Sequence, residues 1–233
     1  VIISIMRSVH EKYAELLVNY CLELKKGETV YIRSSYLAEP LLKEIQREAL
    51  IAGAHPHFDI DFADKEFIFL ENAKDFQLEY VSPFKKHIME KFDAYLVIRA
   101  PFNLKSIQRA NAQASKTAKQ AQSEIMKTYM ERTATRDLKR NLCQYPTSAC
   151  AQEAGMSLSE YEKFIYGACH LYDENPTERW LDVRKSQQKV VDLLNKRTHI
   201  RYKGSDFDVS FKTDGRIWMN SDGQTNMPSG EVY

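Results

Sequence analysis

Residues 29–60 contain a strand, a helix and a second strand in immediate succession, and this order most limits the folds open to the chain. The segment begins with an alternating apolar and polar run through Val30 and Ile32, as a strand does. Pro40 then opens a helical pattern that Gly53 ends, after which the chain returns to an extended pattern. Such a unit usually forms a right-handed crossover between parallel strands. We therefore expect a parallel sheet in the front part of the chain.

A second signal of the same kind lies at residues 94–98, a continuous apolar run typical of a strand buried on both faces of a parallel sheet. Together the two signals predict an α/β fold, with helices layered on a mainly parallel sheet. A nucleotide site in such a sheet needs a glycine-rich turn after a strand. Residues 34–39, which follow the first strand, contain no glycine, and the 8 glycines of the chain form no nucleotide-binding motif. We expect no nucleotide cofactor.

Further helices have clear start signals. Capping boxes begin at Ser8 and Ser157, and Asn175 followed by a proline begins another helix. We expect the helix after Ser8 to end at Gly27 and the helix after Asn175 to end near Asn195. Their apolar residues recur at helical spacing, which predicts that they lie in the core.

Residues 103–140 are rich in Ala, Gln, Lys and Ser, which predicts one or two helices on the surface. Basic side chains dominate there, so a nucleic-acid patch is one interpretation and a solvated helical face is the other. No aromatic stacking platform accompanies the charges, which favours the solvated face. The whole chain has 33 basic and 32 acidic side chains and therefore no global field for nucleic acid or an anionic membrane. We expect neither as a partner.

No apolar run approaches the length of a membrane span, and the apolar opening, residues 1–6, is too short for a signal peptide. These features predict a cytoplasmic protein. Cysteines occur at positions 21, 143, 150 and 169 without metal-binding spacing. We expect them to be reduced and mostly buried, although a metal or disulfide pair of Cys143 and Cys150 is an alternative.

From Thr198 the pattern changes from helical period to alternation, with turn signals at residues 204–206 and 213–215. This predicts a β-meander that includes a strand through Ile217 and Met219. We place a domain boundary near Lys196. Residues 1–196 would form an α/β domain with a helical segment at 103–196, and residues 197–233 would begin a β-rich domain.

Glu231 is the candidate metal ligand, in the run Asn-Met-Pro-Ser-Gly-Glu-Val that occupies residues 226–232. A Pro and a Gly before an acid keep it out of a regular helix, so its carboxylate can be aimed at a fixed point. A solvated Glu at a surface turn is the alternative. Asp222 could support such a site, but its Ser-Asp-Gly context favours a simple turn.

A second set of potential metal ligands lies on one face of residues 55–61, where His55, His57, Asp59 and Asp61 alternate. Alternate side chains of a strand stand roughly 6.6 to 6.8 Å apart, so at most two neighbours could share one ion. An exposed edge strand explains the pattern equally well. The six histidines are otherwise scattered, and we predict that none is a metal ligand.

No other catalytic motif competes. The chain lacks the His-Glu-x-x-His motif of zinc proteases and the Gly-x-Ser-x-Gly motif of serine hydrolases. We therefore assign no catalytic residue from motifs alone.

Three segments near the end, residues 214–218, 220–223 and 226–232, together resemble the metal-site region of the thermophilic-type metalloaminopeptidases, the family of aminopeptidases T and S. Earlier stretches agree in order and spacing, and the Pro-Ser-Gly-Glu run is the most specific match. These earlier stretches are residues 24–28, 52–54 and 145–157. The resemblance spans nearly the whole chain.

The resemblance implies a peptidase that uses two divalent metal ions, such as zinc, cobalt or magnesium, to remove the N-terminal residue of peptide substrates. By the same resemblance Glu231 is the first metal ligand in chain order, and a second Glu, two His and an Asp follow farther downstream in family members. The chain would then be the front part of a longer enzyme, inactive alone. Family members are dimers, which implies a homodimer. The alternative is a noncatalytic α/β module that binds a partner or mediates assembly.

Overall fold

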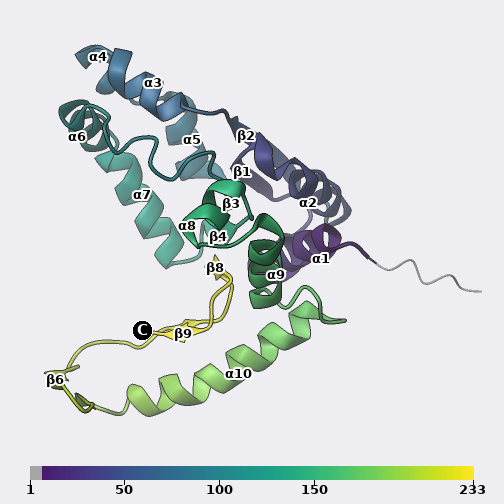
Figure 1. Ribbon diagram of the computed structural model, residues 1–233, viewed down its shortest axis with the longest axis vertical. Helices are drawn as coiled ribbons and strands as arrows, with labels where there is room; N and C mark the ends of the chain where they lie inside the picture. The colour runs from purple at the N-terminus through teal and green to yellow at the C-terminus, as the bar shows by residue number, and fades with distance from the viewer. Residues whose placement is uncertain (1–6) are drawn as a thin grey trace, which may run out of the picture.

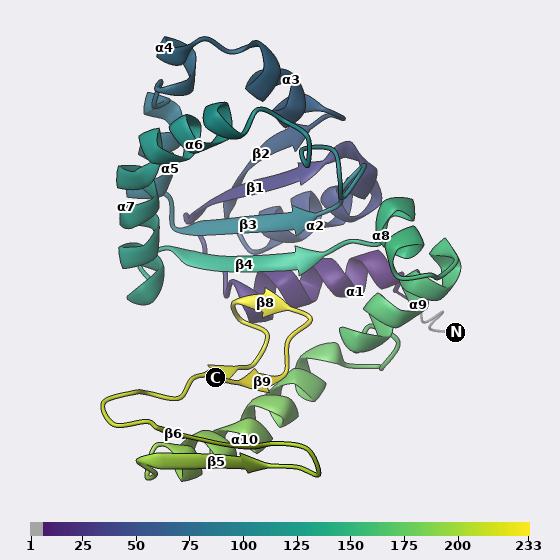
Figure 2. The ribbon, with the colours of Figure 1, turned by 60° about the vertical axis from the view of Figure 1, so that its left-hand side comes forward.

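The computed structural model describes residues 7–233 and is organised around one five-stranded parallel sheet (Figures 1 and 2). The strand order is β2-β1-β3-β4-β8, and each neighbouring pair is parallel. Its strands are β1 (Thr29–Ser35), β2 (His55–Asp61), β3 (Ala94–Arg99), β4 (Lys139–Gln144) and β8 (Asn226–Met227). This arrangement confirms the predicted α/β class with a mainly parallel sheet.

The predicted strand-helix-strand unit is present. Helix α2 (Glu39–Ile51) connects β1 to β2, which pair in register from Thr29 opposite His55 to Ser35 opposite Asp61. The side chains of α2 that face the sheet are buried; they are Leu41, Leu42, Ile45 and Ala49. Because β2 is the outermost strand, the edge-strand interpretation of its alternating His and Asp residues is confirmed.

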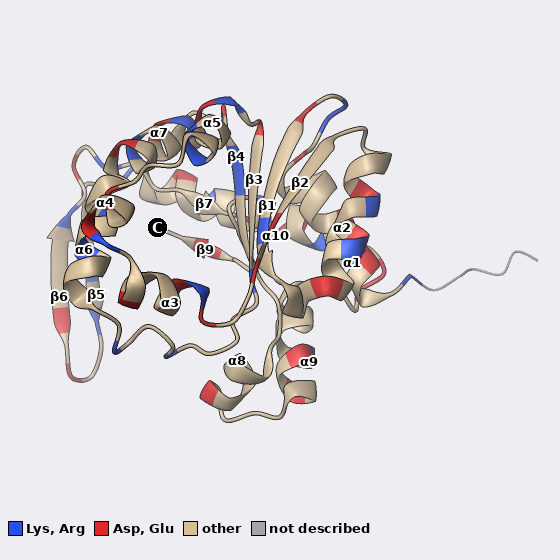
Figure 3. Cartoon of the chain, turned by 90° about the horizontal axis from the view of Figure 1, so that it is seen from above, with Lys and Arg blue, Asp and Glu red and all other residues tan. Residues whose placement is uncertain are grey.

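Helices cover both faces of the sheet, as Figure 3 shows from above, with α1 and α2 on one side and α5, α6 and α7 on the other. Alternate residues of β1 point to opposite faces of the sheet. Val30 and Ile32 pack in the cluster that includes residues of α1 and α2, whereas Tyr31 packs with Ile88 of α5 and Ile125 of α7. Period-two alternation thus builds two cores from one strand. The helices of the second side are α3 (Lys65–Asn72), α4 (Asp75–Leu78), α5 (Pro83–Lys91), α6 (Ala112–Ala121) and α7 (Ser123–Ala134).

The first helical segment begins as predicted but ends earlier. The capping box of Ser8 and Glu11 opens α1 (Val9–Glu15), which continues as a π-helical stretch, η1 (Leu16–Cys21). The chain leaves the helix at Glu23, whose φ of 48° is left-handed, so Gly27 lies in the following turn. The prediction that Gly27 ends this helix was therefore wrong.

Between residues 103 and 196 the sequence predicted only helices, and this is incorrect at one place. Helices α6 and α7 confirm the surface helices, but β4 follows them as an inner strand between β3 and β8. Three more helices complete the segment: α8 (Ser148–Glu153), α9 (Leu158–Ala168) and α10 (Pro176–Leu194). The predicted starts of α9 and α10 and the end of α10 near Asn195 are confirmed.

The last part of the chain contains a hairpin, β5 (His199–Lys203) with β6 (Asp208–Lys212), as predicted. The predicted third strand through Ile217 and Met219 is absent from the described residues. Instead β7 (Asn220–Ser221) pairs with β9 (Glu231–Val232), and β8 between them joins the main sheet beside β4 (Figure 2). The boundary near Lys196 stays a prediction. Strand β8, which lies after this boundary in the sequence, pairs with β4, which lies before it.

Candidate functional site

The bend that carries Glu231 is closed by Ser221. Gly230, with a φ of +114°, donates its N–H to the Ser221 carbonyl at 3.0 Å. The Ser229 hydroxyl lies 2.9 Å from the same carbonyl and 2.7 Å from the Ser221 hydroxyl. Glu231 itself pairs with Ser221 across the β7–β9 ladder. A glycine is needed at position 230 because other residues rarely adopt its backbone conformation. The Pro-Ser-Gly-Glu run therefore forms a defined bend.

This bend is anchored in the main core through Met227. Its side chain is buried, and in β8 it lies opposite Cys143 of β4. The carbonyl of Met227 lies 3.5 Å from the Tyr13 hydroxyl of α1. The chain thus passes from the core to Glu231 within a few residues, which fixes where Glu231 stands relative to the sheet.

The carboxylate of Glu231 is exposed, and the described part of the chain places no hydrogen-bond donor or cation on it. Its backbone is held instead, because the carbonyl accepts a hydrogen bond of 2.5 Å from Gln187 of α10. A carboxylate that is positioned by its backbone and free at its side chain is a suitable ligand for a hard cation.

One carboxylate does not enclose a metal ion. Catalytic zinc sites generally have three protein ligands, and two-ion sites have more. Within residues 7–233, no group of three or more His, Cys, Asp or Glu side chains is arranged to hold an ion. The described residues therefore supply one chemically suited ligand and no complete site.

Asp222 has a structural role. One of its oxygens accepts the Gln224 N–H at 3.2 Å, and the other pairs with the Arg184 guanidinium of α10. Arg184 lies 5.0 Å from the centre of the Tyr20 ring, and the Tyr20 hydroxyl donates to the Asp222 carbonyl at 2.8 Å. Burial is the main reason why the pKa of Tyr20 is raised, and the charge of Asp222 raises it further. These contacts fix the turn between β7 and β8, as the Ser-Asp-Gly pattern indicated.

The histidines lie in separate surroundings. His10 Nε2 is 3.4 Å from the Tyr145 hydroxyl and 3.3 Å from the Tyr166 hydroxyl, and burial lowers the pKa of His10. The His57 ring lies 5.1 Å from the ring of Phe92, beside the second core cluster. Each of these imidazoles packs against aromatic rings.

The four cysteines are buried and free, which confirms the predicted buried thiols and leaves the alternative pair of Cys143 and Cys150 unbonded. Burial raises the pKa of Cys169 to about 12, although a hydrogen bond with Tyr13 opposes the rise. A thiol that stays protonated is a poor nucleophile. The surroundings of Cys169 therefore do not favour catalysis.

Basic residues of the segment 103–140 also form internal contacts. Arg132 donates to the Met89 carbonyl at 2.8 Å, and Arg136 pairs with Glu23 at 3.1 Å. Figure 3 shows acidic and basic residues interspersed along the chain. Both observations favour the solvated-face interpretation of residues 103–140. Within residues 7–233, no helix combines the length and apolar character that a membrane crossing requires.

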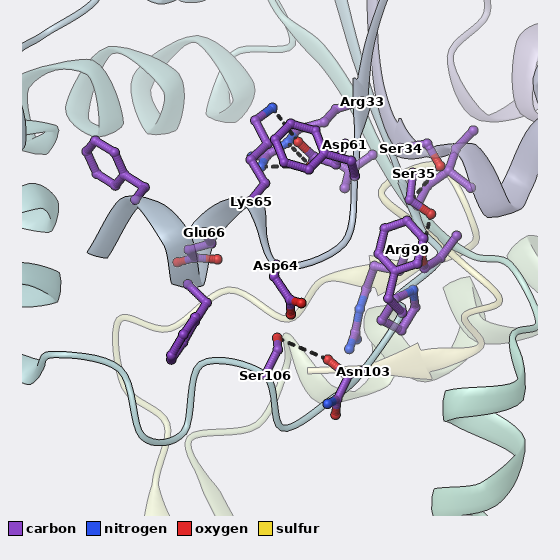
Figure 4. Close-up of a pocket in the computed structure, with 18 residues that line it drawn as sticks. Arg33, Ser34, Ser35, Asp61, Asp64, Lys65, Glu66, Arg99, Asn103 and Ser106 are labelled. Atoms are coloured by element: carbon purple, nitrogen blue, oxygen red, sulfur yellow. Dashed lines mark hydrogen bonds and ion pairs between the residues drawn. The ribbon is translucent and has the colours of Figure 1, made fainter. Parts of the chain in front are cut away.

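The structure also contains a cleft that no motif predicted (Figure 4). It has a volume of about 640 Å³ and lies at the carboxyl ends of β1, β2 and β3. The chain runs from β1 to β2 on one side and later places β3 on the other, so the strand order reverses here. Ligands of open α/β sheets bind at such a switch point. The signal available in the sequence was the strand-helix-strand order followed by charged strand ends at Arg33, Asp61 and Arg99.

Comparisons with known proteins agree with this fold. The chain is 26% identical over 249 residues to aminopeptidase 2 of Geobacillus stearothermophilus, an alignment that covers 96% of this chain and 59% of that protein. It superposes on wild-type AmpT from Thermus thermophilus with a TM-score of 0.78 at 18% identity, covering 96% of this chain and 60% of the other. The chain thus spans about 60% of the length of these relatives. The model of the thermophilic metalloprotease (M29) family matches residues 7–233, so the predicted resemblance is confirmed and the chain belongs to that family.

Proposed function

We propose that the chain is the amino-terminal part of a metal-dependent aminopeptidase, which removes N-terminal residues from peptides. The observation that supports this most directly is the bend at Glu231, because it presents a free carboxylate from a backbone held at Ser221 and Gln187. The family is one of metalloproteases, and one relative is an aminopeptidase by name.

Glu231 is proposed as one ligand of a site for two divalent ions, zinc, cobalt or magnesium, whose other ligands come from sequence after Tyr233. Bound ions would supply a Lewis acid and lower the pKa of a water molecule toward neutrality. The chain's own contribution is positional: Ser221 and Gly230 close the bend, and Gln187 holds the carbonyl of Glu231. The backbone that carries the carboxylate is thereby fixed before any ion binds.

The test compares the longer protein with its Glu231→Gln variant. We expect the metal content, measured by elemental analysis, to fall from about two ions per chain. Aminopeptidase activity on a chromogenic amino-acid substrate should fall by at least about a hundredfold. An exposed glutamate away from the bend provides the control, and Glu79→Gln should leave both quantities unchanged. Unchanged metal content and turnover in Glu231→Gln would remove the proposal.

The 233-residue chain should release no amino acid from the same substrate, with zinc, cobalt or magnesium added, because it supplies a single ligand. Activity of this chain alone would show that the site is elsewhere. Absence of activity from the longer protein as well would favour the noncatalytic assembly module. A cytoplasmic location and a homodimer remain predictions, which cell fractionation and light scattering can check.

A further inference from the structure

Two serines fix the floor of the cleft at the carboxyl ends of β1–β3. The β1–β3 ladder ends where Arg33 lies opposite Val97. Beyond it, the buried Ser34 hydroxyl donates to the Ile98 carbonyl at 3.1 Å, and the buried Ser35 hydroxyl donates to the Ala100 carbonyl at 2.6 Å. Buried side-chain hydrogen bonds of this kind are costly to break. The two strands are therefore tied together below the opening, and the cleft is preformed.

Part of the charge in the cleft is already neutralised. Asp61 accepts hydrogen bonds from Arg33 at 3.0 and 3.1 Å on one oxygen and from Lys65 at 2.6 Å on the other. Burial opposes the ionisation of Asp61, but the Lys65 hydrogen bond and the Arg33 charge outweigh it and lower the pKa of Asp61. This triad lines the upper wall in Figure 4 and stays ionised at neutral pH.

The remaining charged side chains of the lining are free. Arg99, Asp64 and Glu66 form no side-chain hydrogen bond or ion pair within residues 7–233, and all three are exposed. In Figure 4, Arg99 and Asp64 face each other across the lower part of the opening, near Asn103 and Ser106. Asp64 has a left-handed backbone, with a φ of 60°. The cleft thus presents an unpaired cation and unpaired carboxylates on opposite sides.

Apolar surface completes the lining. Phe62 is 56% exposed and Phe69 is 42% exposed, although both lie in a wall of the cleft. Phe102 contributes a further ring, which packs against Tyr36 at a centroid distance of 4.9 Å. Exposed aromatic side chains in a concave site are typical of contacts with an apolar group of a ligand.

We propose that this cleft binds a small zwitterion with an apolar side chain, namely a free α-amino acid or a short peptide. Its carboxylate would pair with Arg99, its ammonium group with Asp64 and Glu66, and its side chain would pack on Phe62. A charge-assisted pair at each end fixes the orientation of such a ligand.

Phosphate-containing ligands fit less well, because they would meet the unpaired carboxylates of Asp64 and Glu66. In the turn after β1, the Leu37 N–H already bonds to the Ser35 hydroxyl at 3.3 Å and is therefore not free to bind a phosphate. A zwitterion satisfies both signs of unpaired charge, whereas an anion satisfies only one.

The inference is independent of the proposed peptidase activity, because no residue from 219 to 233 lines the cleft. Binding of L-leucine would be measured by isothermal titration calorimetry on the protein in excess chelator. The chelator prevents L-leucine from binding to a metal ion at the proposed peptidase site. N-acetyl-L-leucine lacks the ammonium group, L-leucinamide lacks the carboxylate, and glycine lacks the apolar side chain. We expect each to bind at least about tenfold more weakly than L-leucine. A parallel titration with L-leucyl-L-leucine identifies whether the amino acid or the peptide binds more tightly.

The variant Arg99→Gln assigns the carboxylate partner. It should weaken L-leucine binding about tenfold and abolish the difference between L-leucine and L-leucinamide, a change that a purely structural role would not produce. Asp64→Asn should reduce the difference between L-leucine and N-acetyl-L-leucine, and the double variant Asp64→Asn, Glu66→Gln should abolish it. The control is Arg109→Gln, an exposed arginine outside the cleft, which should change neither.

Several outcomes would overturn the inference. One is that neither L-leucine nor L-leucyl-L-leucine binds at about 10 mM. Another is that the analogues lacking one charge bind as tightly as L-leucine. A third is that Arg99→Gln retains the discrimination against L-leucinamide. If Arg99→Gln does not fold, the ligand series on the unaltered protein decides by itself.

Discussion

Strand β1 of the sheet and the β5–β6 hairpin have the same alternating sequence pattern but opposite burial. In β1, Val30 and Ile32 are 1% and 0% exposed. In β6, Val209 and Phe211 are 54% and 41% exposed. The strands of the sheet lie between two helical layers (Figure 3), whereas Tyr202, Val209 and Phe211 of the hairpin are all exposed. Alternation therefore identifies a strand, but burial depends on what packs against it.

Residues 197–233 are nevertheless held in place by a few contacts with the rest of the molecule. Met227 enters the main core, and Asp222 pairs with Arg184 of α10. Asn220 donates to the Arg184 carbonyl at 3.0 Å. One part of the molecule is thus stabilised by a continuous core and the other by a small number of specific anchors, and substitutions should affect them differently.

The largest difference is expected between two phenylalanines. Phe92 is 7% exposed and contacts the Tyr31 ring edge-on at 6.1 Å. Phe92→Ala should lower the free energy of unfolding by about 3 to 5 kcal/mol, because it leaves a cavity in the second core cluster. Phe211→Ala, at an exposed position beside Tyr202, should cost less than about 1 kcal/mol. Urea denaturation measures both, and equal losses would contradict the distinction between core and hairpin.

A substitution at Gly223 tests how firmly residues 197–233 are anchored to the rest of the molecule. Its φ is +97°, and a Cβ atom there would lie 2.7 Å from Met227 Cε and 3.1 Å from the Trp180 ring. Gly223→Ala combines backbone strain with overpacking and should cost about 2 to 4 kcal/mol. The matched control is Gly215→Ala, where φ is +73° but no atom lies within 4 Å of the added carbon.

Only the backbone cost, about 1 to 2 kcal/mol, should remain in Gly215→Ala. Thermal unfolding of both variants gives the comparison. A smaller loss for Gly223→Ala than for Gly215→Ala would show that Met227 and Trp180 pack loosely around Gly223 and that the anchor contributes little.

A smaller, pH-dependent effect is expected at Asp61. Its lowered pKa in the folded state means that ionised Asp61 stabilises the fold above the ordinary carboxyl pKa, and this contribution is lost as the pH falls through the lowered value. Asp61→Asn should cost about 1 kcal/mol at pH 7, since the triad is partly exposed, and nothing in strongly acidic solution. The exposed pair of Asp208 and Arg201 is the control, and Asp208→Asn should have no measurable effect at either pH. A cost that persists in acid would mean that packing, not charge, is responsible.

The sequence predicted those elements whose formation depends on residues close together in the chain. The unit from β1 to β2, the capping box at Ser8 and the β5–β6 hairpin each follow from patterns in one continuous stretch of sequence. The missed strand β4 begins with Lys-Arg-Asn, which does not read as a buried strand. Its polar residues have distant partners, since Lys139 pairs with Glu28 at 2.6 Å and Asn141 donates to the Gly223 carbonyl at 2.9 Å. Such partners are not visible in local periodicity.

The two candidate sites differ in the same way. Glu231 could be selected from a continuous run of residues, and its position at a bend follows from the glycine beside it. The residues of the cleft could not be selected from the sequence, because Arg33, Asp64 and Arg99 belong to three separated segments. Only the order of the strands in the sheet brings these segments together. Strand order is set by helices packing on the sheet, so a site at a switch point becomes visible only once the topology is known.

The smallest effect is expected at Glu231 itself. The described residues engage its backbone but not its carboxylate, so Glu231→Gln should change the free energy of unfolding of the 233-residue chain by less than about 0.5 kcal/mol. Ser221→Ala serves as the positive control, because it removes the hydroxyl that contacts Ser229 at 2.7 Å inside the bend, and should cost about 1 kcal/mol. If Glu231→Gln were as destabilising as Ser221→Ala, the carboxylate would have a structural partner, and loss of metal in that variant could no longer be attributed to the loss of a ligand.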